Sequence, residues 1–336
     1  NLADIFAVQD EITEAATIAI APAVADAELR RAMRKPPDSL DAWAAYQRGL
    51  WHLSKATPSD NSLAEKFFQL AMDLDPSFSG GYQGLAFTQN QTRDSWPSLI
   101  EGLNAIEALA RRAVALDPAN AEARSCLAMA LYNRADYKGA LAEIEHALVT
   151  SPNLAIAHGI FGAILAFSGC PKRGIAALER NIRLDPRDPQ LAIRLNQIAL
   201  AHYFSREYEN VVEVAKQTTR SYPDYPHIHR WLAAALGQLG RTGEAREALD
   251  KAIATAPGAF DMFVRHRVPW MRPEDHAHML EGLRKAGLPK VESRAPQRPW
   301  NNLISVATWL TWPQLGAGDE IWDFLRTAIT AALEAG

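Results

Sequence analysis

The 336 residues include 35 Lys and Arg against 39 Asp and Glu, for a formal charge of −4, and 48% of them are hydrophobic. This composition excludes a disordered chain, and the absence of a long basic run argues against nucleic acid as a main partner. The length fits either two globular domains or one repeat array, because a repeat array has no single hydrophobic core that limits its length.

The chain opens with a helical pattern over residues 2–34, with Ile5, Val8 and Ile12 on one side. Pro22 predicts a break or kink within this pattern, and the Pro36-Pro37 pair ends it. We therefore assign residues 1–37 to an N-terminal helical segment.

Proline then recurs at a nearly constant spacing. Five helical patterns end at Pro118, Pro152, Pro186, Pro223 and Pro257, which are 34, 34, 37 and 34 residues apart. Small residues also recur at fixed unit positions, as at Ala128, Ala140 and Ala147, where two helices must approach closely. A helix–turn–helix unit of 34 residues with this pattern is typical of the tetratricopeptide repeat (TPR).

The repeats predict an all-α fold, a right-handed TPR superhelix (α-solenoid) of about six helical hairpins with helical caps at both ends. Extra residues predict loops around residues 56–61 and 92–98. Charge-free residues 300–318 include three of the tail's four tryptophans. The predicted domains are six TPR-like repeats within 38–257 (approximately 38–78, 79–120, 121–154, 155–188, 189–225 and 226–259), a capping helix in 258–290, and a linker with Trp-rich C-terminal helices in 291–336.

Three phrases carry a family resemblance: residues 2–12 (LADIFAVQDEI), residues 34–37 (RKPP) before 40–43 (LDAW), and residues 281–289 (EGLRKAGLP). They resemble the TPR region of bacterial multidomain regulators. In that family a class III adenylate cyclase domain, or a winged-helix transcription-activator domain, precedes the repeats. The resemblance implies that this chain is the sensor or docking half of a longer protein, and no cyclase residue carries over to it.

No catalytic or ligand motif is present in the sequence. It lacks a phosphate-binding Gly-x-x-x-x-Gly-Lys loop, a Gly-x-Ser-x-Gly elbow, His-Glu-x-x-His and Cys-x-x-Cys. His227 and His229 lie two residues apart, as do His276 and His278, so on a helix the rings of each pair face opposite sides. We therefore predict no enzyme activity for this chain, and no catalytic residue, cofactor or metal.

Two further features concern the compartment. Cys126 and Cys170 are expected to be free, buried thiols, which fits a cytoplasmic protein. The apolar run 154–170 is shorter than the roughly 20 residues of a membrane-spanning helix, so we predict a core helix there and no membrane span.

A surface remains as the candidate for function. In stacked hairpins the first helix of each unit lines a concave groove, and helical spacing predicts which side chains are exposed in it. Rings beside amides suit a bound peptide or helix, although the same rings could simply pack helices together or contact the tail. The candidate groove residues are Arg48, Trp51, Gln83, Phe87, Asn90, Tyr132, Asn133, Phe167, Asn196, Tyr203, Phe204, Arg230 and Gln238.

Three functions compete at this point. The first is a non-catalytic module that recognises a protein or peptide in the groove, as the regulatory or docking part of a bacterial signalling protein. The second is a self-association scaffold, a homodimer that brings two attached cyclase domains together through the Trp-rich tail. The third is a small-molecule sensor that uses the groove around Phe167 and Tyr203.

Overall fold

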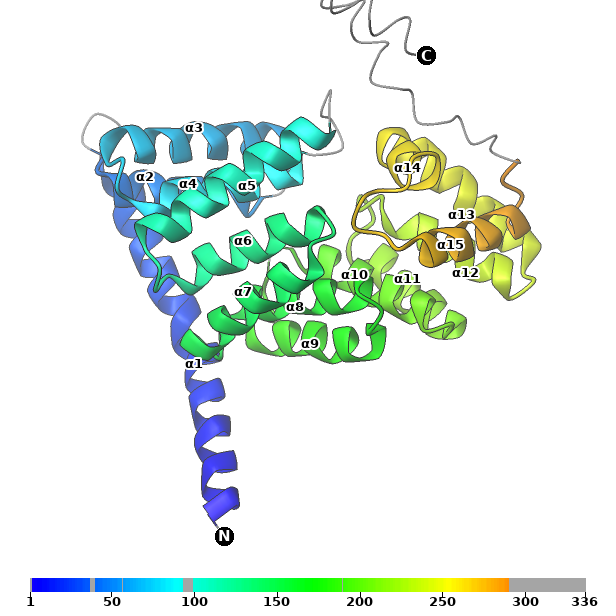
Figure 1. The fold of residues 1–336 in the computed structure, drawn as a ribbon, viewed down its shortest axis with the longest axis horizontal. Helices are drawn as coiled ribbons and strands as arrows, with labels where there is room; N and C mark the ends of the chain where they lie inside the picture. The colour runs from blue at the N-terminus through cyan, green and yellow to red at the C-terminus, as the bar shows by residue number, and fades with distance from the viewer. Residues whose placement is uncertain (1, 37–39, 56, 93–98, 189, 290–336) are drawn as a thin grey trace, which may run out of the picture. The chain divides into compact units, whose positions relative to one another are not determined.

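The structure is a computed structural model that describes residues 2–36, 40–55, 57–92, 99–188 and 190–289. Within these residues the chain forms fifteen helices and no strand (Figure 1). The helices are α1 (Leu2–Arg34), α2 (Ala42–Leu53), α3 (Pro58–Leu74), α4 (Ser79–Gln91), α5 (Leu99–Leu116), α6 (Ala121–Asn133), α7 (Tyr137–Thr150), α8 (Ala155–Phe167), α9 (Pro171–Leu184), α10 (Leu191–Phe204), α11 (Tyr208–Ser221), α12 (Ile228–Gln238), α13 (Thr242–Thr255), α14 (Pro257–Val264) and α15 (Pro273–Lys285).

Helices α2 to α13 pair in chain order into six hairpins, and each hairpin packs on the next (Figure 1). Helix α1 precedes the hairpins, and α14 and α15 follow them. The expected α-solenoid is confirmed, whereas the repeat boundaries assigned from the prolines stay a prediction. Residues 290–336, which hold the Trp-rich tail, lie outside the described residues.

Small residues set how closely the two helices of a hairpin approach. A Cβ atom on Gly162 of α8 would lie 2.8 Å from the carbonyl oxygen of Gly174 on α9, and one on Gly174 would lie 2.7 Å from the carbonyl oxygen of Gly162. Both distances are shorter than ordinary contacts, so the two backbones meet where the repeat pattern has small residues.

The start of α3 differs from expectation. Residues 56–61 were expected to loop out, but α3 begins at Pro58. Thr57 caps the helix by accepting a 3.1 Å hydrogen bond from the Asp60 backbone N–H, and proline fits the first helical turn because its missing N–H has no partner there. The extra residues therefore lengthen the helix. The other expected loop falls largely on residues 93–98, outside the described residues.

Helix α1 is not broken at Pro22, because it continues from Leu2 to Arg34. A proline inside a helix removes one backbone hydrogen bond, and the alanine-rich sequence on both sides of it favours the helix strongly enough to continue. The end of α1 packs on α2, where Trp43 Nε1 donates a 2.9 Å hydrogen bond to Glu28 and the Arg48 guanidinium donates to the Ala32 carbonyl at 3.3 Å.

Up to residue 289, where the described residues end, two helices follow the last hairpin in place of the single capping helix expected in 258–290. Helix α14 begins at Pro257, where the sequence pattern predicted only the end of a repeat, and α15 begins at Pro273. We call residues 257–288 the C-terminal segment. Its buried side chains, such as Phe260, Trp270 and Met279, belong to the same hydrophobic core as those of α6 to α13.

Candidate functional site

The predicted stripe is not exposed in this structure, because every candidate groove residue is buried or partly buried. The prediction of an exposed stripe was therefore wrong. Partly buried candidates are Arg48, Trp51, Phe87, Asn90, Phe204 and Gln238. Buried candidates are Gln83, Tyr132, Asn133, Phe167, Asn196, Tyr203 and Arg230.

The link between α14 and α15 covers part of the groove at α6 and α7. Trp270 lies in this link, is 1% exposed, and packs edge-on against Tyr132 with ring centroids 6.4 Å apart. The Tyr137 hydroxyl donates a 2.6 Å hydrogen bond to the Trp270 carbonyl oxygen, and burial raises the pKa of Tyr137 to about 12. Tyr132 in turn stacks on Phe167 at 6.1 Å.

Helix α15 covers the groove at α10. The Tyr203 hydroxyl donates a 2.9 Å hydrogen bond to the His278 carbonyl oxygen, and the two rings stack with centroids 4.6 Å apart. The His278 ring nitrogen Nε2 also lies 2.8 Å from the Tyr208 hydroxyl. Burial raises the pKa of Tyr203 and lowers the pKa of His278, since both charged forms lose solvation.

Contacts with α12 complete the cover. The Arg230 guanidinium lies 4.1 Å from the ring centroid of Phe263 in α14, and Gln238 accepts a 2.7 Å hydrogen bond from Lys285 of α15. Phe204 packs edge-on against Phe167 at 5.7 Å. These aromatic side chains therefore pack helices together, so a small-molecule site around Phe167 and Tyr203 is not retained.

The candidates of the first hairpins also contact their own chain. The Asn133 amide donates to the Asn90 side-chain oxygen at 2.8 Å, and Lys55 lies 3.3 Å from the ring centroid of Trp51. Phe87 packs against the hydrophobic core. In the fifth hairpin, Asn196 on α10 is buried, with 9% of its surface exposed.

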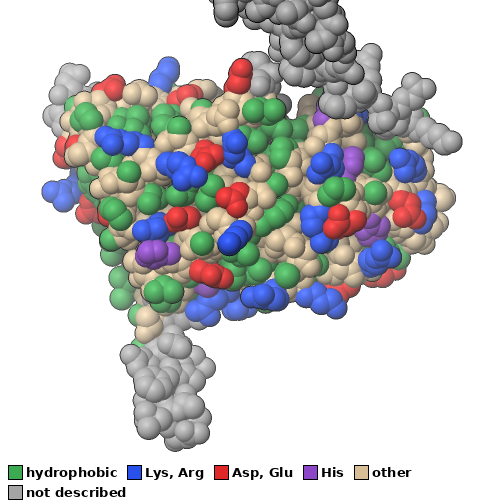
Figure 2. Space-filling view, viewed as in Figure 1, with side chains coloured by type: hydrophobic (Ala, Val, Ile, Leu, Met, Phe, Trp, Pro, Cys, Tyr) green, Lys and Arg blue, Asp and Glu red, His purple; other side chains and the backbone are tan. Residues whose placement is uncertain are grey.

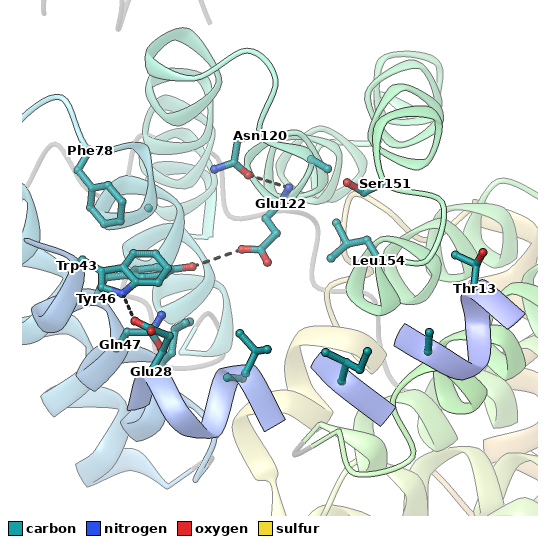
Figure 3. Close-up of a pocket in the computed structure, with 17 residues that line it drawn as sticks. Thr13, Glu28, Trp43, Tyr46, Gln47, Phe78, Asn120, Glu122, Ser151 and Leu154 are labelled. Atoms are coloured by element: carbon teal, nitrogen blue, oxygen red, sulfur yellow. Dashed lines mark hydrogen bonds between the residues drawn. The ribbon is translucent and has the colours of Figure 1, made fainter. Parts of the chain in front are cut away.

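A separate pocket of about 880 Å³ lies between α1 and the hairpins that follow it (Figure 3). Four helices, α1, α2, α4 and α6, contribute to it, together with the turn that precedes α8. We call it the α1 pocket. Its lining residues are Thr13, Ala16, Ile20, Val24, Ala25, Glu28, Trp43, Tyr46, Gln47, Leu50, Phe78, Gly80, Asn120, Ala121, Glu122, Ser151 and Leu154.

Apolar side chains at the α1 pocket are open to solvent. Ile20 is 59% exposed, Val24 is 55% exposed and Trp43 is 46% exposed. Large apolar side chains that gather at an exposed cleft mark interaction sites more often than single exposed ones do.

The polar groups of the α1 pocket are held in place by hydrogen bonds. The Glu122 carboxylate accepts from the Gln83 amide at 2.8 Å and from the Tyr46 hydroxyl at 3.4 Å through the same oxygen (Figure 3 draws the Tyr46 contact). Asn120 caps α6, since its side-chain oxygen accepts from the backbone N–H of Glu122 at 2.9 Å. Burial, and then the negative charge of Glu122, raise the pKa of Tyr46.

The charge of the α1 pocket has one sign. Glu28 and Glu122 are the charged residues among the described lining residues, which include no Lys or Arg. By contrast, acidic and basic side chains are interspersed over the hairpins, with Lys and Arg along the edge where α9 lies (Figure 2). The acidic character is thus local to the pocket.

Sequence reasoning missed the α1 pocket. The signal for Glu122 was present, because it occupies the second position of the unit that starts at Ala121 and so belongs to the inner stripe. The contribution of α1 gave no such signal, because a repeat register does not predict how a preceding helix crosses the stack.

The two cysteines are free, as predicted. Cys126 is buried, but Cys170 is exposed, which corrects the expectation for that residue. Cys170 is the residue before α9 and not part of the helix pair.

Across the described ranges, no cluster of three or more His, Cys, Asp or Glu side chains is placed to hold a metal ion. Nor does any helix in those ranges combine the length and apolarity needed to cross a membrane.

Comparisons with known proteins show the fold. No family model matches the chain, and no curated protein matches it. Among solved structures, the anaphase-promoting-complex assembly Cut9-Hcn1 aligns with 72% of this chain at 13% identity and a TM-score of 0.53. The alignment covers 42% of the Cut9-Hcn1 chain, so this chain spans less than half of that relative.

Two other solved structures are similar at lower TM-scores. The alignment with yeast Tom70 covers 76% of this chain and 54% of the Tom70 chain, at 17% identity and a TM-score of 0.46. YrrB is described as a TPR protein with an unusual peptide-binding site. Its alignment covers 56% of this chain and 92% of the YrrB chain, at 19% identity and a TM-score of 0.38. The stacked hairpins, with the alignment to Cut9-Hcn1 at a TM-score of 0.53, show the all-helical α-solenoid fold that is expected of a TPR region.

Proposed function

We propose that this chain is a non-catalytic module that recognises a protein or peptide through the α1 pocket. The observation that carries the proposal is the exposure of Ile20, Val24 and Trp43 at an open cleft of about 880 Å³. Burying such apolar area is favourable by about 25 cal/mol per Å², so the cleft offers binding energy to a polypeptide that fills it.

The wider role is the cytoplasmic regulatory or docking part of a bacterial signalling protein with an adenylate cyclase-like head. The phrases at 2–12, 34–43 and 281–289 support this role through their resemblance to TPR regions of such regulators. Residues 281–289 end α15 and include the close contact of that helix with α12, so this phrase coincides with the C-terminal segment that fills the groove.

Selection from a random peptide library on the immobilised full chain tests the proposal. Enriched peptides should bind the chain in solution with a Kd on the order of 1 μM, and Ile20→Asp should abolish the binding. Val149→Asp is the matched control, because Val149 is 80% exposed on α7 and does not line the pocket. Failure to enrich any peptide, or equal effects of the two variants, would contradict the proposal.

A further inference from the structure

We infer that the α1 pocket binds a basic amphipathic helix of a partner protein. This inference rests on the proposed function and specifies the class of partner that the pocket takes.

The shape of the pocket favours a helix. Its lining along α1 runs from Thr13 to Glu28, which spans about 22 Å at 1.5 Å per residue. A partner helix of about 15 residues has the same length, so it can lie along α1 and contact α2, α4 and α6 with its other side. Ile20 and Val24 are four residues apart, the spacing at which side chains on one helix face meet the apolar row of another.

The charge of the pocket favours basic side chains on that helix. Glu28 on α1 and Glu122 on α6 contribute carboxylates to the pocket, and the described lining residues include no Lys or Arg. Arg31, outside the lining, lies 3.9 Å from the Glu28 carboxylate and compensates part of its charge, so Glu122 is the stronger attraction for a basic side chain. The Gln83 amide and the Tyr46 hydroxyl hold the Glu122 carboxylate in place, so a Lys or Arg of the partner meets an oriented acceptor. An acidic helix would be repelled at Glu122 and, more weakly, at Glu28.

The chain's own tail does not have this chemistry. Residues 300–336 carry one basic residue, Arg326, against Asp319, Glu320, Asp323 and Glu334. The net charge of the tail is therefore negative, the same sign as that of the pocket. A separate partner with the opposite charge is the better electrostatic match.

Two designed peptides test the inference on the full chain. Both peptides have 16 residues, a dye label, and Leu at positions i, i+3 and i+4, which form one face of a helix. The Lys peptide has Lys at the remaining, polar positions, and the Glu peptide has Glu there. Fluorescence anisotropy should give a Kd for the Lys peptide at least about tenfold lower than for the Glu peptide, with a difference that shrinks as salt is added.

Variants locate the bound peptide. Ile20→Asp should weaken binding of the Lys peptide at least about tenfold, whereas Val149→Asp should leave it unchanged. The double variant Glu28→Gln with Glu122→Gln should weaken binding several-fold and flatten its salt dependence, because Gln keeps the shape and the acceptor but removes the charge. Glu145→Gln, an exposed change on α7 outside the pocket, is the control. Circular dichroism confirms that each variant is folded.

The remaining outcomes overturn the inference. Equal affinity for the Glu peptide, still lost in Ile20→Asp, would reject the basic partner but leave the proposed function standing. Absence of binding by either peptide, with no peptide enriched from the library, would reject both. A molar mass by light scattering that falls to the monomer in Ile20→Asp but not in Val149→Asp would assign the pocket to a second copy of this chain.

Discussion

The Tyr203 hydroxyl of α10 donates a 2.9 Å hydrogen bond to the carbonyl oxygen of His278 in α15, 75 residues further along the chain. This bond joins the inner side of the hairpin stack to the C-terminal segment. Because the same segment also places Trp270 on Tyr132, the chain itself covers the predicted groove at α6 and α10. The α1 pocket, which this segment does not line, is the site on which the functional proposal rests.

Tyr203→Phe should lower the free energy of unfolding by about 0.5–1.5 kcal/mol, since it removes one buried hydrogen bond while keeping the ring stacked on His278. Urea denaturation of the two proteins measures the difference. Tyr82→Phe is the control, because the Tyr82 hydroxyl makes a longer, 3.2 Å bond at an exposed site. A loss as large in the control would contradict the importance of the groove contact.

Gly282→Ala should displace α15 from α12. A Cβ atom at Gly282 would lie 2.5 Å from the Ala234 carbonyl oxygen and 2.5 Å from the Tyr203 hydroxyl. We expect a loss of about 1–3 kcal/mol and faster hydrogen exchange in residues 257–288.

The matched control for Gly282→Ala is Gly243→Ala. No atom lies within 4 Å of a Cβ atom at Gly243 in α13, so alanine should leave stability unchanged or raise it by up to about 1 kcal/mol. Destabilisation of similar size at both glycines would show that helix packing is not the cause.

The stability of the C-terminal segment should depend on pH. Burial lowers the pKa of His278 below its ordinary value of 6.5, so the folded protein binds fewer protons than the unfolded chain in this range. The stabilisation is therefore present above pH 6.5 and is lost as the pH falls through the lowered pKa. The charges of Arg206 and Glu281 also act on the ring.

Urea denaturation at a series of pH values between about 5 and 8 measures this effect. The slope of the free energy of unfolding against pH is compared between the wild type and a His278 variant. In His278→Gln, the free energy of unfolding should fall less steeply toward acidic pH than in the wild type. Some dependence should remain, because burial also lowers the pKa of His229 and His276. Identical slopes in the two proteins would exclude His278 as a contributor.

Asn120→Ala should cost about 1 kcal/mol of stability, because it removes the cap that accepts from the backbone N–H of Glu122 and Ala123. It should also weaken binding of the Lys peptide, since the cap fixes the turn that carries Glu122. Asn120→Ser keeps a capping hydroxyl and should retain most of both properties. If serine and alanine behave alike, the cap does not contribute.

The sequence predicted much of the fold for a physical reason. A repeat imposes the same packing at each unit, so small residues such as Gly162 and Gly174 recur where backbones meet, and their spacing can be read without a structure. The candidate groove residues follow from the same register, because it indicates which positions turn inward.

The cover over the groove could not be predicted in the same way. Residues 265–272 have no periodicity, yet they place Trp270 on Tyr132 and lead into α15. This contact is between residues far apart in the sequence, and a repeat pattern carries no information about it. The start of α3 differs from the prediction for a local reason, since Thr57 and Pro58 form the cap and first turn of a helix where the extra residues predict a loop.

Hydrogen exchange of the full chain with and without the Lys peptide tests the central claim most directly. If the partner lies in the α1 pocket, peptide binding should slow exchange in residues 13–28 of α1 and leave residues 257–288 unchanged. Altered exchange in residues 257–288 with none in α1 would contradict the account, because it would show that the peptide competes for the filled groove.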